Sequence, residues 1–190
     1  LPGMTLLHRD EDRRPFECDG LSAYRVMPML VALPDTADQV VTLLRICREL
    51  RVPVVTRGAG TGLSGGALPL EQGVLLVMSR FNRIVELDPD ARTARVQPGV
   101  RNLAISEAAA PHGLYYAPDP SSQIACSIGG NVAENAGGVH CLKYGLTVHN
   151  VLAVGVALVD GTVVEIGGTA PASPGYDLLA LMIGSEGMLG

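Results

Sequence analysis

The sequence lacks features that would point to several common protein classes. It has no surplus of basic residues, because 14 Lys and Arg stand against 19 Asp and Glu and give a net charge of −5. A nucleic-acid-binding surface is therefore not expected, since such surfaces are rich in Lys and Arg. No apolar run approaches the roughly 20 residues that a membrane-spanning helix needs. The start of the chain leads into the charged residues 9–14 and shows no signal segment, so we expect a cytoplasmic protein without a membrane span.

Paired cysteines are also missing. The four cysteines are scattered through the chain, without a C-x-x-C pair: Cys18, Cys47, Cys126 and Cys141. This spacing is typical of reduced cytosolic thiols rather than of a disulfide framework. His140, Cys141 and His149 could be combined with Cys126 into a zinc site, but the adjacent ligands His140 and Cys141 diverge too far for tetrahedral geometry. We therefore expect no metal site here.

Glycine, in contrast, is concentrated in one loop. Residues 57–66 read Arg-Gly-Ala-Gly-Thr-Gly-Leu-Ser-Gly-Gly and directly follow the apolar run 52–56. Glycine in regular structure costs roughly 0.5–1 kcal/mol relative to Ala, so this density indicates a close backbone approach, most often a nest of N–H groups around a phosphate. Arg57 adds a cation, and Thr61 and Ser64 add hydroxyls for the same anion. A surface turn without a ligand is the alternative.

The residues that follow this loop show which type of phosphate-binding loop it can be. Gly60-x-Gly62-x-x-Gly65 fits the dinucleotide fingerprint, which has meaning only when a helix follows. Pro69 and Gly73 leave no room for a helix before the apolar run 74–78. A Walker loop is excluded because no Gly-Lys-Ser/Thr follows. We therefore predict a phosphate-cradling loop between two nearby strands.

Periodicity along the chain predicts a globular α+β protein, with 47% apolar and 17% charged residues. We expect helices from Asp35 or Thr36 to about residue 50, over 100–110, after a cap at Ser127, and over 177–183. Strands are expected at 54–56, 74–78, 84–87 and 94–97, with a hairpin of 151–158 and 162–166 around Asp160-Gly161. This organisation divides the chain into an N-terminal segment (1–33), a first lobe (34–113) and a second lobe (114–190) that the sequence leaves unfinished. We interpret the chain as part of a longer protein.

The order of the glycine motifs points to a family. Residues 57–61 are followed by Pro-Asp-Pro-Ser at 118–121, Ser-Ile-Gly-Gly at 127–130, Asn-Ala-Gly-Gly at 135–138 and Gly-Ser-Glu-Gly at 184–187. This series resembles the FAD-binding domain of the vanillyl-alcohol-oxidase and para-cresol-methylhydroxylase (PCMH) type flavoproteins. Residues 17–24 and 126–144 are similar to the D-lactate dehydrogenase and glycolate oxidase branch of that group.

The resemblance implies a PCMH-type domain of two α+β subdomains, with FAD held between them and the second subdomain truncated here. It implies that one loop wraps the FAD pyrophosphate: Arg57, Gly58, Ala59, Gly60, Thr61, Gly62 and Leu63. A second set would line the cofactor: Pro118, Asp119, Pro120 and Ser121. A third would bring donors to the phosphates and ribityl chain: Ser127, Gly129, Gly130 and Asn131. Nearer the adenine end would lie Pro34, Glu186 and Gly187.

The resemblance also bears on the chemistry. Some relatives tether the flavin through a His in the first glycine loop, and because this loop has none we expect non-covalent FAD. Asp119 and Glu134 are candidate acid–base groups by residue type. The family, however, carries its substrate-binding His and Arg residues and any metal in a C-terminal domain that is absent from these residues. We therefore assign no catalytic residue, and we expect the 190 residues alone to be inactive and either to bind FAD poorly or to aggregate.

Three functions stay open at this point. The resemblance implies the FAD-binding domain of a 2-hydroxy-acid oxidoreductase, acting on glycolate or D-lactate, that passes hydride from the substrate α-carbon to flavin N5. Its implied partners are a second flavin subunit and an iron–sulfur subunit, through which the protein would associate with the inner face of the membrane. The alternatives are a non-catalytic electron-relay subunit and an NADPH-dependent reductase with the same flavin fold.

Overall fold

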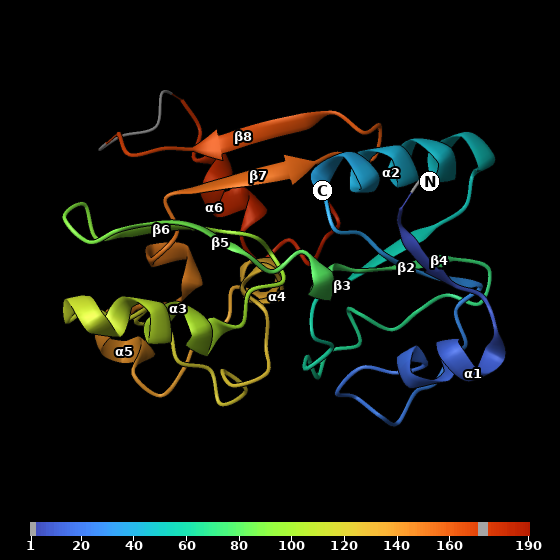
Figure 1. Ribbon diagram of the computed structural model, residues 1–190, viewed down its shortest axis with the longest axis horizontal. Helices are drawn as coiled ribbons and strands as arrows, with labels where there is room; N and C mark the ends of the chain where they lie inside the picture. Colours follow the sequence, from blue (N-terminus) through green and yellow to red (C-terminus); the bar gives the residue numbers. More distant parts are fainter. Residues whose placement is uncertain (1–2, 171–174) are drawn as a thin grey trace.

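The first half of the chain is organised around a small, mostly parallel sheet. The computed structural model describes residues 3–170 and 175–190 (Figure 1). The sheet has the strand order β1-β2-β4-β3, formed by β1 (Thr5–Leu7), β2 (Leu30–Leu33), β4 (Val74–Val77) and β3 (Val54–Arg57). β4 pairs in parallel with both β2 and β3, while β1 pairs antiparallel with β2. The carboxyl ends of β2, β3 and β4 therefore meet at one edge.

Helix α2 (Ala37–Leu50) connects β2 to β3 and covers one face of the sheet. It begins where expected, because the Thr36 hydroxyl accepts a hydrogen bond from the backbone N–H of Gln39 at 3.3 Å. Its apolar stripe buries Val40, Leu43 and Cys47 in a cluster with Val74 and Leu76 of β4. This burial follows from the apolar spacing along α2, which places the three side chains on one face.

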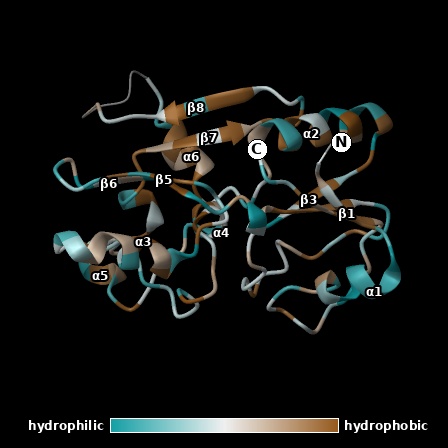
Figure 2. Ribbon diagram, in the orientation of Figure 1, coloured by the Kyte–Doolittle hydropathy of each residue, from teal (hydrophilic) through white to brown (hydrophobic). Residues whose placement is uncertain are grey.

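The N-terminal segment covers the opposite face of the sheet. It contains α1 (Asp10–Arg13) and the 3-10 turn η1 (Arg14–Phe16), and the Phe16 ring packs on a cluster of Val31, Leu75 and Val77. With both faces covered, β4 is buried at all four positions, and the sheet region is correspondingly apolar in Figure 2. Strands β1 and β2 are not among the elements expected from the sequence. Each is only three or four residues long. β1 pairs with β2, and β2 in turn pairs with β4 from farther along the chain.

The second half begins with a hairpin and a helix that share a separate core. After the 3-10 turn η2 (Met78–Arg80), β5 (Ile84–Asp88) pairs antiparallel with β6 (Thr93–Val96), and α3 (Asn102–Ala109) continues into η3 (Ala110–His112). Their core joins Val100 and Ile105 to Ile128, with Ile84 and Val96 packed against it. This cluster contains residues from both sides of the lobe boundary expected at 113/114, which stays a prediction.

The remaining elements pack around the first two groups. They are α4 (Ile128–Glu134), α5 (Cys141–Tyr144), η4 (Thr147–His149), β7 (Ala153–Ala157), β8 (Val163–Gly167) and α6 (Leu178–Met182). β7 and β8 form the hairpin expected from Asp160-Gly161, with the Asp160 carboxylate accepting from the Thr162 N–H at 2.8 Å. The hairpin extends alongside α2, where Arg45 donates to the Gly161 carbonyl at 3.3 Å (Figure 1). Among the helices of the described residues, none has the length and apolarity to cross a bilayer.

Candidate functional site

The glycine loop begins at the carboxyl edge of the sheet. Strand β3 ends at Arg57, and the loop runs without a helix from residue 58 to residue 73, all of which the structure describes. It returns directly to β4, which pairs in parallel with β3, so the expected connection between neighbouring strands is confirmed. The carboxyl edge of a parallel sheet is where ligands bind in open α/β structures.

Two of the glycine motifs meet at this edge. Gly58 lies so close to Ser127 that a Cβ on Gly58 would collide with the Ser127 hydroxyl. Ser127 precedes α4 and is buried, and its hydroxyl oxygen has no hydrogen-bond partner among the described residues. An unsatisfied buried hydroxyl is costly unless a ligand or water completes it. The contact between Gly58 and Ser127 therefore places an unsatisfied buried hydroxyl where two of the glycine motifs meet.

A cavity of about 440 Å³ opens beside this contact. Gly58, Ala59 and Ser127 line it from the motifs expected to bind the cofactor. The rest of its wall was not expected from the sequence: Ser79, Asn82, Ile84, Gly99, Val100, Arg101, Ala104 and Ala125. The Pro98-Gly99 dipeptide signals a turn, but nothing in the sequence indicates that this turn packs against η2. There, a Cβ on Gly99 would collide with the Met78 carbonyl.

A buried chain of amides fixes α4 relative to the loop at 118–121. The Asn131 side-chain amide donates to the side-chain oxygen Oδ1 of Asn102 at 2.9 Å, and the Asn102 side-chain amide nitrogen Nδ2 donates to the Pro118 backbone carbonyl at 3.0 Å. Both asparagines are almost fully buried. Asn131 was expected to bring a donor to the cofactor, and that contact stays a prediction. In this structure its side-chain amide donates to Asn102, so these hydrogen bonds join α4 to the loop at 118–121.

Arg57 turns away from the cavity and toward the N-terminal segment. Its guanidinium donates to the Cys18 carbonyl at 2.6 Å and lies 5.8 Å from the centre of the Phe16 ring. Burial lowers the pKa of Arg57, while the nearby Asp19 carboxylate favours the charged form. The same guanidinium packs against Gly60, whose φ of +70° lies in the left-handed region. Arg57 thus shapes the loop through contacts within the protein.

The C-terminal end of α4, which includes Glu134, contacts both the glycine loop and the turn at 184–187. The Ser64 hydroxyl lies 3.5 Å from a carboxylate oxygen of Glu134, and the N–H groups of Gly184 and Glu186 donate to carbonyls of α4 at 2.8 and 2.9 Å. Burial raises the pKa of Glu134, and the charge of Glu186 adds to that rise. Glu186 and Gly187 both have positive φ, at 55° and 73°. The turn therefore packs on the end of α4 that is opposite Ser127.

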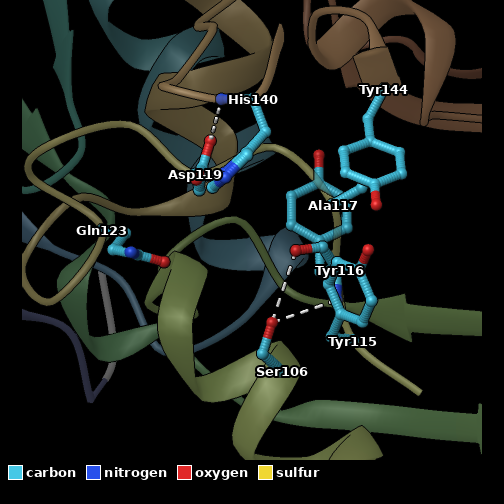
Figure 3. Close-up of a pocket in the computed structure, with 8 residues that line it drawn as sticks. All are labelled: Ser106, Tyr115, Tyr116, Ala117, Asp119, Gln123, His140 and Tyr144. Carbon is cyan, nitrogen blue, oxygen red and sulfur yellow. Dashed lines mark hydrogen bonds and ion pairs between the residues drawn. The ribbon is translucent and has the colours of Figure 1, made fainter.

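Asp119 lines a different cavity, of about 320 Å³ (Figure 3). Its carboxylate accepts from the His140 backbone N–H at 3.2 Å and lies 2.6 Å from His140 Nδ1, and these hydrogen bonds lower the pKa of Asp119. The Tyr115 and Tyr144 rings meet edge to face across the same cavity, 6.1 Å apart. Behind them, burial raises the pKa of Tyr116 to about 12.

The structure thus brings some predicted residues together and leaves others apart. Gly58, Ala59 and Ser127 share one cavity, Asp119 faces another, and the buried Pro34 directly follows β2 at the carboxyl edge of the sheet. The remaining predicted residues lie on the loops and the helix between these points: Gly60, Thr61, Gly62, Leu63, Pro120, Ser121, Gly129 and Gly130. Their contacts with a cofactor stay predictions.

The residues at the Gly58–Ser127 contact fit a dinucleotide cofactor. The buried Ser127 hydroxyl can donate to a phosphate oxygen, and the adjoining loop offers backbone that approaches closely because it lacks Cβ atoms. A diphosphate needs such oriented donors more than it needs net positive charge. For metals, the described residues contain no group of three or more His, Cys, Asp or Glu side chains arranged to hold an ion.

Comparisons with known proteins agree with this fit. A family model described as an FAD binding domain matches residues 28–167. The sequence is 70% identical to the glycolate oxidase subunit GlcD of Escherichia coli strain K12 over 190 residues, which is all of this chain and 38% of that protein. It is 44% identical to the subunit of the same name from Bacillus subtilis over 179 residues, covering 94% of this chain and 38% of that protein.

Two further matches extend the comparison. A D-lactate dehydrogenase of Anaerostipes hadrus is 38% identical over 183 residues, covering 95% of this chain and 38% of that protein. A solved structure of alkyldihydroxyacetonephosphate synthase superimposes with a TM-score of 0.83 at 24% identity, covering all of this chain and 36% of that one. That synthase therefore shares the fold of this chain. The present chain therefore spans about two fifths of the length of the relatives it matches.

Proposed function

This chain belongs to the family of FAD binding domains, and from that premise we propose that it forms the flavin-binding part of a 2-hydroxy-acid oxidoreductase. The observation that carries the proposal is the contact of Gly58 with the buried, unpartnered hydroxyl of Ser127 beside a cavity at the carboxyl edge of the sheet. The names of the relatives, glycolate oxidase subunit and D-lactate dehydrogenase, support a 2-hydroxy acid as the substrate class.

The residues of this chain bind and orient the cofactor in this proposal. The backbone N–H groups of the 58–62 loop and the Ser127 hydroxyl would hold the FAD pyrophosphate, and the asparagine chain from Asn131 to Pro118 keeps the neighbouring loop in place. When bound, FAD supplies the hydride acceptor for the oxidation of a 2-hydroxy acid. The loop contains no His, so we propose non-covalent binding.

Substrate recognition and assembly are proposed for the whole protein. Because the chain spans 38% of its glycolate oxidase relatives, the substrate-binding residues would lie in the remainder. The word "subunit" in the relatives' names supports an assembly, and we propose a second flavin subunit and an iron–sulfur subunit as its partners. We further propose a cytoplasmic location, with association to the inner membrane face through those partners.

Anaerobic reduction of the full-length protein tests this function. The flavin absorbance is followed after addition of glycolate, D-lactate or NADPH in separate samples. We expect bleaching by glycolate, by D-lactate or by both, and none by NADPH. Bleaching by NADPH alone would instead show a reductase, and bleaching only by a protein partner would show an electron relay. Acid precipitation of the same sample should release all of the flavin into the supernatant, whereas flavin in the pellet would contradict non-covalent binding.

A further inference from the structure

A short N-terminal segment forms a closed loop beside the glycine loop. We call residues 17–26 the N-terminal hook. Its ends are joined by a hydrogen bond from the Val26 N–H to the Glu17 carbonyl at 2.8 Å and by an ion pair of Arg25 with the Glu17 carboxylate at 2.5 Å. Inside it, the Asp19 carboxylate accepts from the Leu21 N–H at 2.9 Å. These bonds give the hook a fixed shape without a helix or strand.

The hook packs directly against the backbone of the glycine loop. A Cβ on Gly20 would lie 2.6 Å from the Gly62 carbonyl oxygen and 2.8 Å from the Thr61 carbonyl oxygen. The φ of Gly20 is not positive, so the available space, and not the backbone conformation, requires glycine there. An alanine would push against two backbone carbonyls that cannot move independently of the loop. The position of Gly20 therefore sets the position of Thr61 and Gly62.

The hook also determines where Arg57 lies. The Cys18 carbonyl accepts from the Arg57 guanidinium at 2.6 Å, and Phe16, just before the hook, stacks beneath it. Asp19 is 6% exposed, and one of its carboxylate oxygens has no hydrogen-bond partner among the described residues. A buried carboxylate is costly unless a positive charge lies near. Asp19 directly follows Cys18, the residue whose carbonyl accepts from Arg57, so the turn that binds this guanidinium also carries the buried carboxylate, whose charge favours the charged form of Arg57. Arg57 in turn packs against Gly60 within the loop.

We propose that the N-terminal hook is a positioning part of the cofactor site, in which Asp19 and Gly20 hold Arg57 and the 58–62 loop in the shape that receives the FAD diphosphate. This inference rests on the proposed FAD binding. It adds residues that lie before the 28–167 region matched by the family model. Asp19 acts through Arg57, and Gly20 acts through the loop backbone, so neither needs to touch the cofactor.

Affinity measurements on the full-length protein test the proposal. The apoprotein is titrated with FAD and with ADP, which carries the diphosphate but no flavin. Gly20→Ala and Asp19→Asn are each expected to lower the affinity for FAD and for ADP about tenfold or more, because small misplacements of a binding group have large effects. Gly155→Ala and Asp12→Asn are the matched controls and are expected to bind like the parent. A Cβ at Gly155 meets nothing within 4 Å, and Asp12 is exposed on α1.

A double-mutant cycle separates positioning from general destabilisation. If Asp19 acts through Arg57, Asp19→Asn should weaken FAD binding in the parent protein and have no further effect in an Arg57→Gln background. Additive losses in the cycle would overturn the proposal, as would parent-like affinity for FAD in Gly20→Ala. If the parent protein itself bound no FAD, the proposed function would fail as well. If the parent bound FAD and the hook variants matched the controls, the inference alone would fail.

Discussion

The two halves of the molecule bury their strands to very different degrees. In the first half, β4 lies between two parallel neighbours and between two covered faces, so all four of its residues are buried. In the second half, β7 and β8 pair with each other and with no other strand among the described residues. Val163 of β8, for example, is 57% exposed. The comparison shows that the first half completes a core within this sequence, whereas the hairpins of the second half leave apolar surface uncovered.

This difference explains the construction of the candidate site. The loop that begins at Gly58 follows β3, which pairs along its whole length with the fully buried β4, so the start of the loop is held by that pairing. Ser127 approaches it from the second half, where fixed geometry depends on buried hydrogen bonds such as that of Asn102 with Asn131. The Gly58 side of the site is thus positioned by strand pairing with β4, and the Ser127 side by buried hydrogen bonds together with the apolar cluster of Ile128.

The largest expected effect distinguishes the two kinds of strand. Leu75→Ala removes a fully buried side chain from β4 and should lower the free energy of unfolding by about 2–5 kcal/mol. Val163→Ala on the exposed face of β8 should change it by less than about 0.5 kcal/mol. Urea unfolding of both variants measures the difference. Similar losses in the two strands would contradict the comparison.

A smaller effect tests the polar contacts of the second half. Asn102→Ala leaves the Asn131 amide without its acceptor and the Pro118 carbonyl without its donor. Since unpaired buried polar groups are costly, we expect a loss of about 1–3 kcal/mol. Amide hydrogen exchange should accelerate in α3 and α4 while β4 stays protected. Equal acceleration in β4 would show that the two halves unfold as one unit.

Removing the capping hydroxyl of α2 should lower the free energy of unfolding by about 1 kcal/mol. Thr36→Ala removes the acceptor for the Gln39 N–H and should destabilise the protein by that amount. Thr36→Ser keeps the hydroxyl and should recover most of the loss. Unfolding free energies that do not separate the alanine variant from the serine variant would contradict the capping role.

The smallest effect concerns the pair formed by the half-buried Asp119 and the exposed His140. Hydrogen bonds from His140 lower the pKa of Asp119, and a carboxylate with a depressed pKa stabilises the fold above its unfolded pKa. That stabilisation is lost as the pH falls through the folded value, below about pH 4. The difference in unfolding free energy between the parent and Asp119→Asn should therefore shrink as the pH falls below about 4. A difference that is constant across this range would contradict the assignment.

Sequence patterns predict the regular elements of this chain well and the shape of the site less well. The stripe of Val40 and Cys47, the cap at Thr36 and the Asp160-Gly161 turn are local signals, and the structure confirms the elements they predict. Strand β2 has no such signal, because its pairing depends on β4 more than 40 positions later. The support of the glycine loop by Gly20 is likewise invisible in the sequence, since it depends on the way residues 17–26 fold back.

The binding constant for FAD of Gly58→Ala, measured in the full-length protein beside Gly155→Ala, tests the central claim most directly. A methyl group on Gly58 would displace the Ser127 hydroxyl from the contact proposed to receive the diphosphate, whereas one on Gly155 meets open space. The account predicts that Gly58→Ala binds FAD about tenfold more weakly or worse, and that Gly155→Ala binds like the parent. Equal binding constants for the two variants would contradict it.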